Sequence, residues 1–142
     1  KGSAFSDNGL ALVYFTSEDG GTIYRSERTT VVQDWGAPQK VRVHGRPPKM
    51  EYLTWPSLTG GGKYLLFSSP EPGNRSSEYG GVADMAGSRY EYSDPRSLLL
   101  DGKPFVTRGG RYCEATGELF YCHPTDTPPH REIELRVAKV EK

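Results

Sequence analysis

The sequence repeats one short pattern three times, and this repetition constrains the fold more than any other feature. Each copy has a glycine-bearing turn, a short strand of apolar and aromatic residues, and a second turn. The copies are SDNGLALVYFTSEDGG, LTGGGKYLLFSSPEPG and EATGELFYCHPTDTPP. Their aromatic strands end at Phe15, Phe67 and Tyr121, which lie 52 and 54 residues apart. This near-constant spacing predicts a repeated structural unit.

Further strand candidates follow each copy. They are TIYRSER, then GVADMA and SRYEYSD, and finally IELRVAKV, in which Ile133, Leu135 and Val137 alternate with other residues. Gly and Pro, 17 and 11 residues, are scattered between the apolar runs and interrupt every helical pattern. We therefore predict a single all-β domain with almost no helix and with units of about 1–46, 47–102 and 103–142.

Units of roughly 40 to 50 residues with several short strands are typical of β-propeller blades. A single small sheet cannot bury its face alone, so it stacks on a neighbour. A β-sandwich also has many short strands with regular turns, but its strands need not recur as whole units. We predict three blade-like antiparallel sheets, with a β-sandwich as the alternative.

The first unit, GLALVYFTSEDGGTIYRSERTTVVQDWGAPQKV, resembles a blade of the WD40-like, TolB-type propellers, in which "DG..LYFTS" precedes "IY...R" and "W..P..V". The stretch WPSLTGGGKYLLFSSPEPG also resembles blades of five-bladed glycosidase propellers. Both resemblances imply a propeller fold and a secreted or periplasmic location. The shared motifs concern packing and turns, so they do not specify a function.

Two departures from these families matter. Thr54 stands where the five-bladed glycosidases carry their general acid. Three blades are also too few to close a ring, and the end units would expose strand edges. We therefore expect the ring to be completed by the rest of a longer polypeptide or by a homo-oligomer.

An enzyme that hydrolyses glycosidic bonds needs two carboxylates about 5 to 10 Å apart. The carboxylates near predicted strand starts are Glu51, Asp84, Asp94 and Glu114. Glu51 and Glu114 are the candidate catalytic residues, but no spacing selects a pair. Solvated surface carboxylates are the simpler interpretation.

Aromatic side chains offer candidate ligand-binding residues, because rings stack on sugars and hydroxyl groups form hydrogen bonds. The candidates are Trp35, Trp55, Tyr79 and Tyr90. Packing between units is the alternative explanation for both tryptophans, whereas Tyr79 and Tyr90 are expected to be exposed. We expect connections near 70–81 and 123–131 to carry the binding surface.

Metal and cofactor signals are sparse. His123, Asp126 and His130 are candidate ligands in the loop HPTDTPPH, but their spacing matches no established site, so we predict no metal. Asp7, Asn8 and Asp19, in the turns SDNGL and SEDGG, are candidate calcium ligands. Asx-type turns explain these residues without an ion, so no cofactor is predicted.

The two cysteines flank the predicted turn ATGE. With the turn centred between Thr116 and Gly117, Cys113 would pair with Phe120, and a disulfide to Cys122 would need a longer loop. Two small half-buried thiols are the alternative.

Charge and hydropathy exclude two classes of partner. Lys and Arg number 18 against 18 Asp and Glu, so there is no net field to attract nucleic acid. No apolar run approaches the roughly 18 residues that span a bilayer. Without a readable active site, we predict a non-catalytic binding or assembly module for a protein or glycan. The alternative is a carbohydrate-active enzyme, or a fragment of one, which would require a carboxylate pair facing an axial cavity.

Overall fold

The computed structural model describes residues 2–18, 21–50, 52–71, 74–107, 109–124 and 133–139. In these ranges strands dominate and no α-helix occurs, while η2 (Pro48–Met50) is a single 3-10 turn. The predicted all-β fold is confirmed. No helix in the described residues has the length and apolar character needed to cross a membrane.

The strands follow one another as three antiparallel meanders. The first meander contains β1 (Ser3–Phe5), β2 (Ala11–Thr16), β3 (Thr22–Glu27) and β4 (Gln39–Val43). The second contains β5 (Thr54–Thr59), β6 (Tyr64–Glu71), β7 (Asn74–Ala86) and β8 (Ser88–Ser97). The third contains β11 (Gly110–Cys113), β12 (Glu118–Pro124) and β13 (Ile133–Lys139). A small hairpin of β9 (Leu99–Leu100) and β10 (Lys103–Pro104) connects the second and third meanders.

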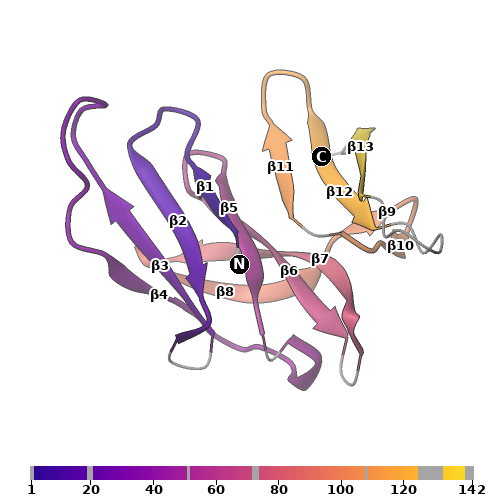
Figure 1. The fold of residues 1–142 in the computed structure, drawn as a ribbon. Coiled ribbons are helices and arrows are strands. Elements are labelled where there is room, and N and C mark those ends of the chain that lie inside the picture. The colour runs from indigo at the N-terminus through magenta and orange to yellow at the C-terminus, as the bar shows by residue number, and fades with distance from the viewer. Residues whose placement is uncertain are drawn as a thin grey trace.

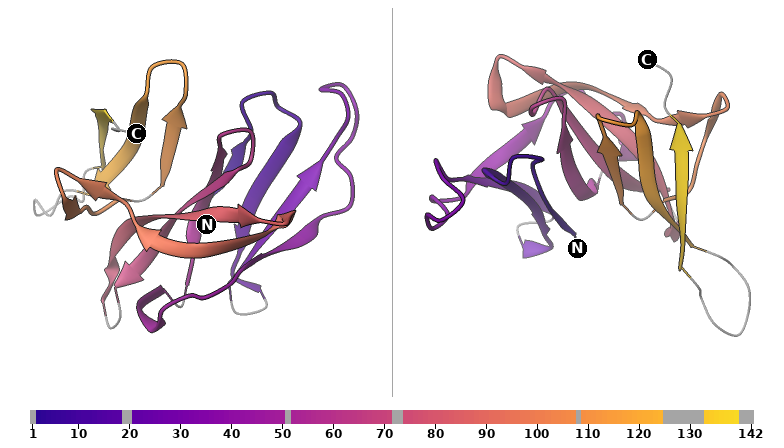
Figure 2. Two further views of the ribbon diagram at one scale, coloured as in Figure 1. Left: turned by 180° about the vertical axis from the view of Figure 1, so that it is seen from behind. Right: turned by 90° about the horizontal axis from the view of Figure 1, so that it is seen from above.

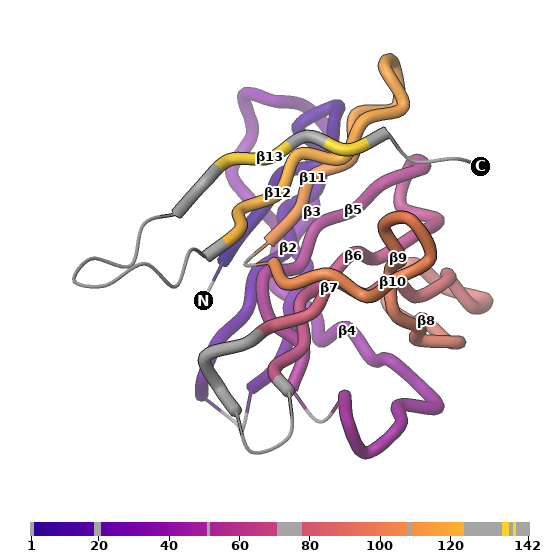
Figure 3. Tube along the Cα trace, turned by 90° about the vertical axis from the view of Figure 1, so that its right-hand side faces the viewer, coloured from indigo at the N-terminus to yellow at the C-terminus, as the bar shows by residue number. Residues whose placement is uncertain are grey.

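The first two meanders join into one sheet because β4 pairs with β8 in parallel. The strand order is β1-β2-β3-β4-β8-β7-β6-β5, and β5 at one end contacts β1 at the other. The sheet therefore curls into a nearly closed, barrel-like shape (Figure 1). The third meander is a separate sheet beside it, with β13 on the outside (Figures 2 and 3).

Strand β6 packs into two cores at once. Leu65 and Phe67 belong to the cluster between the first and second meanders, which includes the buried Val13 and Tyr92. Leu66 points the other way, because successive side chains of a strand face opposite sides. It packs with Leu119 in a second cluster beneath the third meander. The second meander is thus covered by apolar side chains on both faces.

Glycines allow the tight turns that the repeated pattern predicted. Gly9, between β1 and β2, and Gly117, between β11 and β12, both have a φ of 69°. This left-handed conformation is strained for residues with a side chain but not for glycine. The amide N–H groups of Gly9 and Gly117 donate to the carbonyls of Ser6 and Cys113, at 2.9 Å in both turns.

The segment 70–81 is mostly strand, whereas its composition predicted a connection between strands. Most of it lies in β6 and β7, where Tyr79 pairs with Ser69 and Gly80 with Ser68. Pro70 is tolerated because a register shift separates it from Glu71, so its missing N–H falls at an irregular point of the ladder. Pro70 therefore marks a bulge rather than the end of a strand.

The cysteine hairpin differs from the predicted register by two residues. Cys113 pairs with Glu118 rather than with Phe120, because residues 114–117 form a four-residue turn. Cys122 lies further along β12, and its N–H donates to the Gly109 carbonyl at 3.3 Å. Both thiols are unbridged and half-buried, as expected from two cysteines that are not opposite each other.

Candidate functional site

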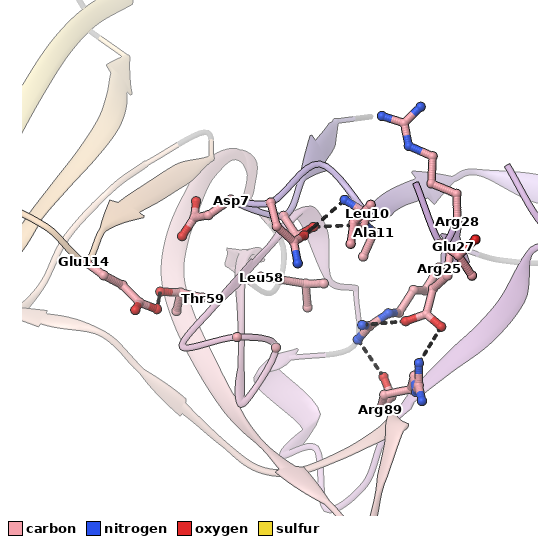
Figure 4. Close-up of a pocket in the computed structure, with 15 residues that line it drawn as sticks. Asp7, Leu10, Ala11, Arg25, Glu27, Arg28, Leu58, Thr59, Arg89 and Glu114 are labelled. Carbon is pink, nitrogen blue, oxygen red and sulfur yellow. Dashed lines mark hydrogen bonds and ion pairs between the residues drawn. The ribbon is translucent and has the colours of Figure 1, made fainter. Parts of the chain in front are cut away.

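The turns between the first and second strands of all three meanders meet at one cavity of about 580 Å³. They are residues 6–10, 60–63 and 114–117. Six charged side chains line the cavity, three cationic and three anionic: Arg25, Arg28, Arg89, Asp7, Glu27 and Glu114 (Figure 4). The site is therefore polar and balanced in charge.

The first turn is held together by its own side chains. Asn8 Oδ1 accepts hydrogen bonds from Ser6 Oγ at 2.8 Å and from the Leu10 N–H at 3.0 Å. Asp7 forms an ion pair with Arg111 of β11 at 3.3 Å, which links the first meander to the third. The hydrogen bonds of Asn8 match an Asx-type turn. In the described part of the chain no group of three or more His, Cys, Asp or Glu is arranged to hold a metal ion.

An ion-pair network forms one wall of the cavity. Arg25 lies 2.7 Å from one oxygen of Glu27, and Arg89 lies 2.7 Å from the other. Arg25 also donates to the Arg89 carbonyl at 3.1 Å, and Tyr90 donates its hydroxyl to Glu27 at 3.3 Å. Arg25 is only 8% exposed. Burying its charge is tolerated because Glu27 neutralises it.

Tyr92 lies beside Arg25 and Glu27 of this network. It is fully buried, and its hydroxyl donates to the Gly62 carbonyl at 2.8 Å. Burial raises the pKa of Tyr92, and the neighbouring Arg25 partly opposes the shift. Burial and the charge of Glu27 also raise the pKa of Tyr90. Both phenols therefore resist ionisation in the folded protein.

These shifts predict how stability changes at alkaline pH. Above about pH 10, the ordinary pKa of tyrosine, the unfolded chain loses phenolic protons that the folded protein keeps, so the free energy of unfolding falls as pH rises. Tyr92→Phe should cost about 1 kcal/mol at neutral pH through the lost hydrogen bond. Above about pH 10, the free energy of unfolding of the Tyr92→Phe variant should fall less steeply than that of the wild type. Urea unfolding on both sides of pH 10 measures the two slopes, and equal slopes would contradict the assignment.

Glu114 is the one catalytic candidate that the structure places at the cavity. One of its carboxylate oxygens accepts hydrogen bonds from the Gly60 N–H and, at 3.3 Å, from Thr59 Oγ1. It thereby ties the turn of the third meander to that of the second. Glu114 and Glu27 lie on opposite sides of the cavity in Figure 4. The other candidate, Glu51, lies outside the described residues, as do Asp19, Asp126 and His130.

The aromatic candidates divide between the cavity and other places. Tyr90 donates a hydrogen bond to Glu27 in the cavity wall. The guanidinium carbon of Arg28, which also lines the cavity, lies 4.3 Å from the centre of the Trp35 ring. Tyr79 lies instead at a hollow beside Met50, away from the turns. Both tyrosines were predicted to be exposed, but each is half-buried. Tyr90 donates a hydrogen bond to Glu27, and Tyr79 is paired within the sheet.

Trp55 lies between the first and third meanders. Its φ is 50°, at an irregularity of β5, and its indole N–H donates to the buried Glu78 at 3.2 Å. It lines a separate apolar hollow with Phe5 and Phe120. Trp55 therefore packs between meanders and also lines a hollow, and its role in ligand binding stays a prediction.

His123 contacts a backbone carbonyl of the chain that precedes β11. Its Nδ1 lies 3.0 Å from the Val106 carbonyl, which fits a hydrogen bond in the tautomer that protonates Nδ1. This contact fastens β12 to the chain that precedes β11. The other two members of the candidate set, Asp126 and His130, lie outside the described residues, so the set of three stays a prediction.

Sequence reasoning missed Arg25, Glu27 and Arg89, although a signal for two of them was present. Side chains two apart in a strand face the same side, so Arg25 and Glu27 follow the buried Ile23 along the inner face of β3. Two charges on an inward face indicate either a buried ion pair or a site. Arg89 comes from β8, about sixty residues later, and no local pattern predicts that it meets them.

No family model matches this chain, and neither a curated protein nor a solved structure matches it. A functional assignment therefore rests on the cavity itself. Fold and site together define an all-β protein with a charge-balanced polar cavity where its turns meet.

Proposed function

We propose that this protein is a non-catalytic binding module of the β-propeller type that holds a glycan or a polar protein segment in the cavity at its turns. One observation carries the proposal: corresponding turns of three meanders meet at a single polar cavity. Ligand sites form where loops from several elements converge on a rigid scaffold. A secreted or periplasmic location belongs to the same proposal.

The arrangement of the strands supports blade-like stacking. Each meander begins with a strand near the middle of the molecule, because β5 contacts both β1 and β11. The second meander packs against its neighbours on both faces, as a blade does. In this proposal further blades, from a longer polypeptide or a second copy, complete the ring. The shared core of the first two meanders also fits a sandwich, which is the alternative.

The chemistry of the cavity favours a neutral, hydroxyl-rich ligand. Arginines supply donors and carboxylates supply acceptors, so the wall matches hydroxyl groups that do both. The charges cancel across the site, which gives no preference for a strongly anionic or cationic partner. A glycan fits this pattern better than a charged peptide. A glycan array probed with the labelled protein tests the assignment, and a polar peptide library covers the protein alternative.

The alternative function is a carbohydrate-active enzyme, and Glu114 is the residue that favours it. Against it, both oxygens of Glu27 are engaged by arginines, and Glu114 holds the Gly60 turn. Glu114→Gln keeps the size of the side chain and removes its charge. We expect this variant to keep glycan binding within about tenfold of the wild type, since one charged hydrogen bond weakens. Hydrolysis of array glycans by the wild type, abolished in Glu114→Gln, would establish the enzyme instead.

A further inference from the structure

The polar groups of the cavity lie on two sides, with aliphatic side chains between them. In Figure 4, Asp7 and Glu114 are on one side and Arg25 and Arg89 are on the other, while Leu58 lies between the two sides. A carboxylate only accepts hydrogen bonds and a guanidinium only donates them. A ligand that spans the cavity must therefore present a donor to the first side and an acceptor to the second.

Each side keeps hydrogen-bonding capacity that the protein itself does not use. Glu114 accepts the bonds from the Gly60 N–H and Thr59 Oγ1 with one oxygen, and among the described residues its other oxygen has no partner. Arg89 donates to Glu27 from one terminal nitrogen at 2.7 Å, and its side chain is 60% exposed. A ligand can therefore donate to Glu114 and accept from Arg89 without displacing a contact of the protein.

The aliphatic side chains between the two sides form the floor of the cavity. Leu10, Ala11 and Leu58 all line it. Ala11 and Leu58 are 5% and 7% exposed and belong to the main core, whereas Leu10 is half-buried. A hydroxyl group placed against such a floor loses its hydrogen bonds to water, whereas a methyl group there gains by leaving water. The floor therefore favours a ligand with an apolar substituent.

We propose that the cavity selects an N-acetylated amino sugar and recognises its acetamido group. This inference rests on the proposed glycan-binding function and names the class of glycan. The amide is planar and trans, so its N–H and its carbonyl point in opposite directions. The N–H is directed to Glu114 and the carbonyl to Arg89, while the methyl group packs on Leu10 and Leu58.

Other substituents at the same position satisfy only part of the cavity. A hydroxyl group bonds to either side but places a polar atom over the aliphatic floor. A free amine pairs with Glu114 but offers no acceptor to Arg89, because an ammonium group only donates. A carboxylate pairs with Arg89 but repels Glu114. The acetamido group is neutral, which also matches the balanced charge of the site.

The test uses the β-1,4-linked trimers of N-acetylglucosamine, glucosamine and glucose, which differ only in the substituent at one carbon of each ring. Each trimer is titrated calorimetrically into the whole wild-type chain. The N-acetylglucosamine trimer should bind at least about tenfold more tightly than the glucose trimer, because a buried methyl group contributes about fourfold and the amide hydrogen bonds add the rest.

The outcomes separate this inference from the proposed function. Equal affinity for the acetylated and the glucose trimers would overturn the inference and leave glycan binding standing. Tightest binding of the glucosamine trimer would overturn it too, because the site would then select a cation. Failure of all three trimers to bind would also sink the inference, whereas the proposed glycan function fails only if the array shows no bound glycan at all.

Leu10→Ser removes part of the aliphatic floor, and Leu12→Ser is its matched control. Leu12 is also half-buried, but it does not line the cavity. Leu10→Ser should reduce the preference for the acetylated trimer over the glucose trimer about fourfold, and Leu12→Ser should leave that preference unchanged. The ratio of two ligands is compared within one variant, so a partly unfolded fraction cancels. An undiminished preference in Leu10→Ser would show that the methyl group does not lie on this floor.

Discussion

Phe67→Ala is expected to lower the free energy of unfolding by about 3–5 kcal/mol. Phe67 is 3% exposed, and its ring lies over Gly81 on β7 so closely that a Cβ there would be 2.3 Å from it. Removing the ring leaves a cavity in the core between the first two meanders, which the neighbouring strands cannot fill without breaking their pairing. Domains are stable by only about 5–15 kcal/mol, so much of the stability would be lost.

Phe120→Ala is the control for this experiment. Phe120 is an aromatic residue of a central strand, but it is 38% exposed on β12. Its loss should cost clearly less than that of Phe67, at most about 1.5 kcal/mol. Chemical denaturation of both variants gives the comparison. Equal losses would contradict the placement of the main core between the first and second meanders.

Arg89→Ala is expected to weaken ligand binding at the cavity by about tenfold or more. Arg89 is 60% exposed and lines the cavity, so its guanidinium is open to a ligand. A hydrogen bond from a charged donor contributes about 1.5–3 kcal/mol, which corresponds to at least tenfold in affinity. Its loss also leaves one oxygen of Glu27 without its ion pair, so the Glu27 side chain in the cavity wall is held less firmly. Calorimetric titration with the strongest glycan from the array measures the change.

Arg96→Ala provides a closely matched comparison. Arg96 is also on β8, is 45% exposed, and pairs with Asp84 and Asp94, but it does not line the cavity. Its removal should leave affinity unchanged. If both variants bound equally well, or both lost binding together, the cavity would not be the binding site.

Most strands were predictable because they rest on local patterns. The repeated turn–strand motif located β2, β6 and β12, and alternation of apolar residues located β13. The parallel contact of β4 with β8 was not predictable. The paired residues are Arg42 with Glu91 and Val43 with Tyr92, and no local signal specifies a pairing across about fifty residues.

The site was predictable only in part, for a related reason. Glu114 and the turn around Asp7 were singled out from sequence, and both border the cavity. Trp55 was singled out for its chemistry, but it lies at a separate hollow between meanders and not at the cavity. The ion-pair network depends on Arg89 meeting β3, a contact set by tertiary packing rather than by spacing in the chain.

The most direct test of the binding proposal is a heteronuclear NMR titration of the wild-type chain with the strongest glycan from the array. We predict saturable shifts of backbone amides in the turns 6–10, 60–63 and 114–117 and at Arg89. Amides of β13 should not move with ligand. A titration that leaves these three turns unchanged, or shifts amides only at the Trp55 hollow or at β13, would contradict the central claim that the three turns form one binding site.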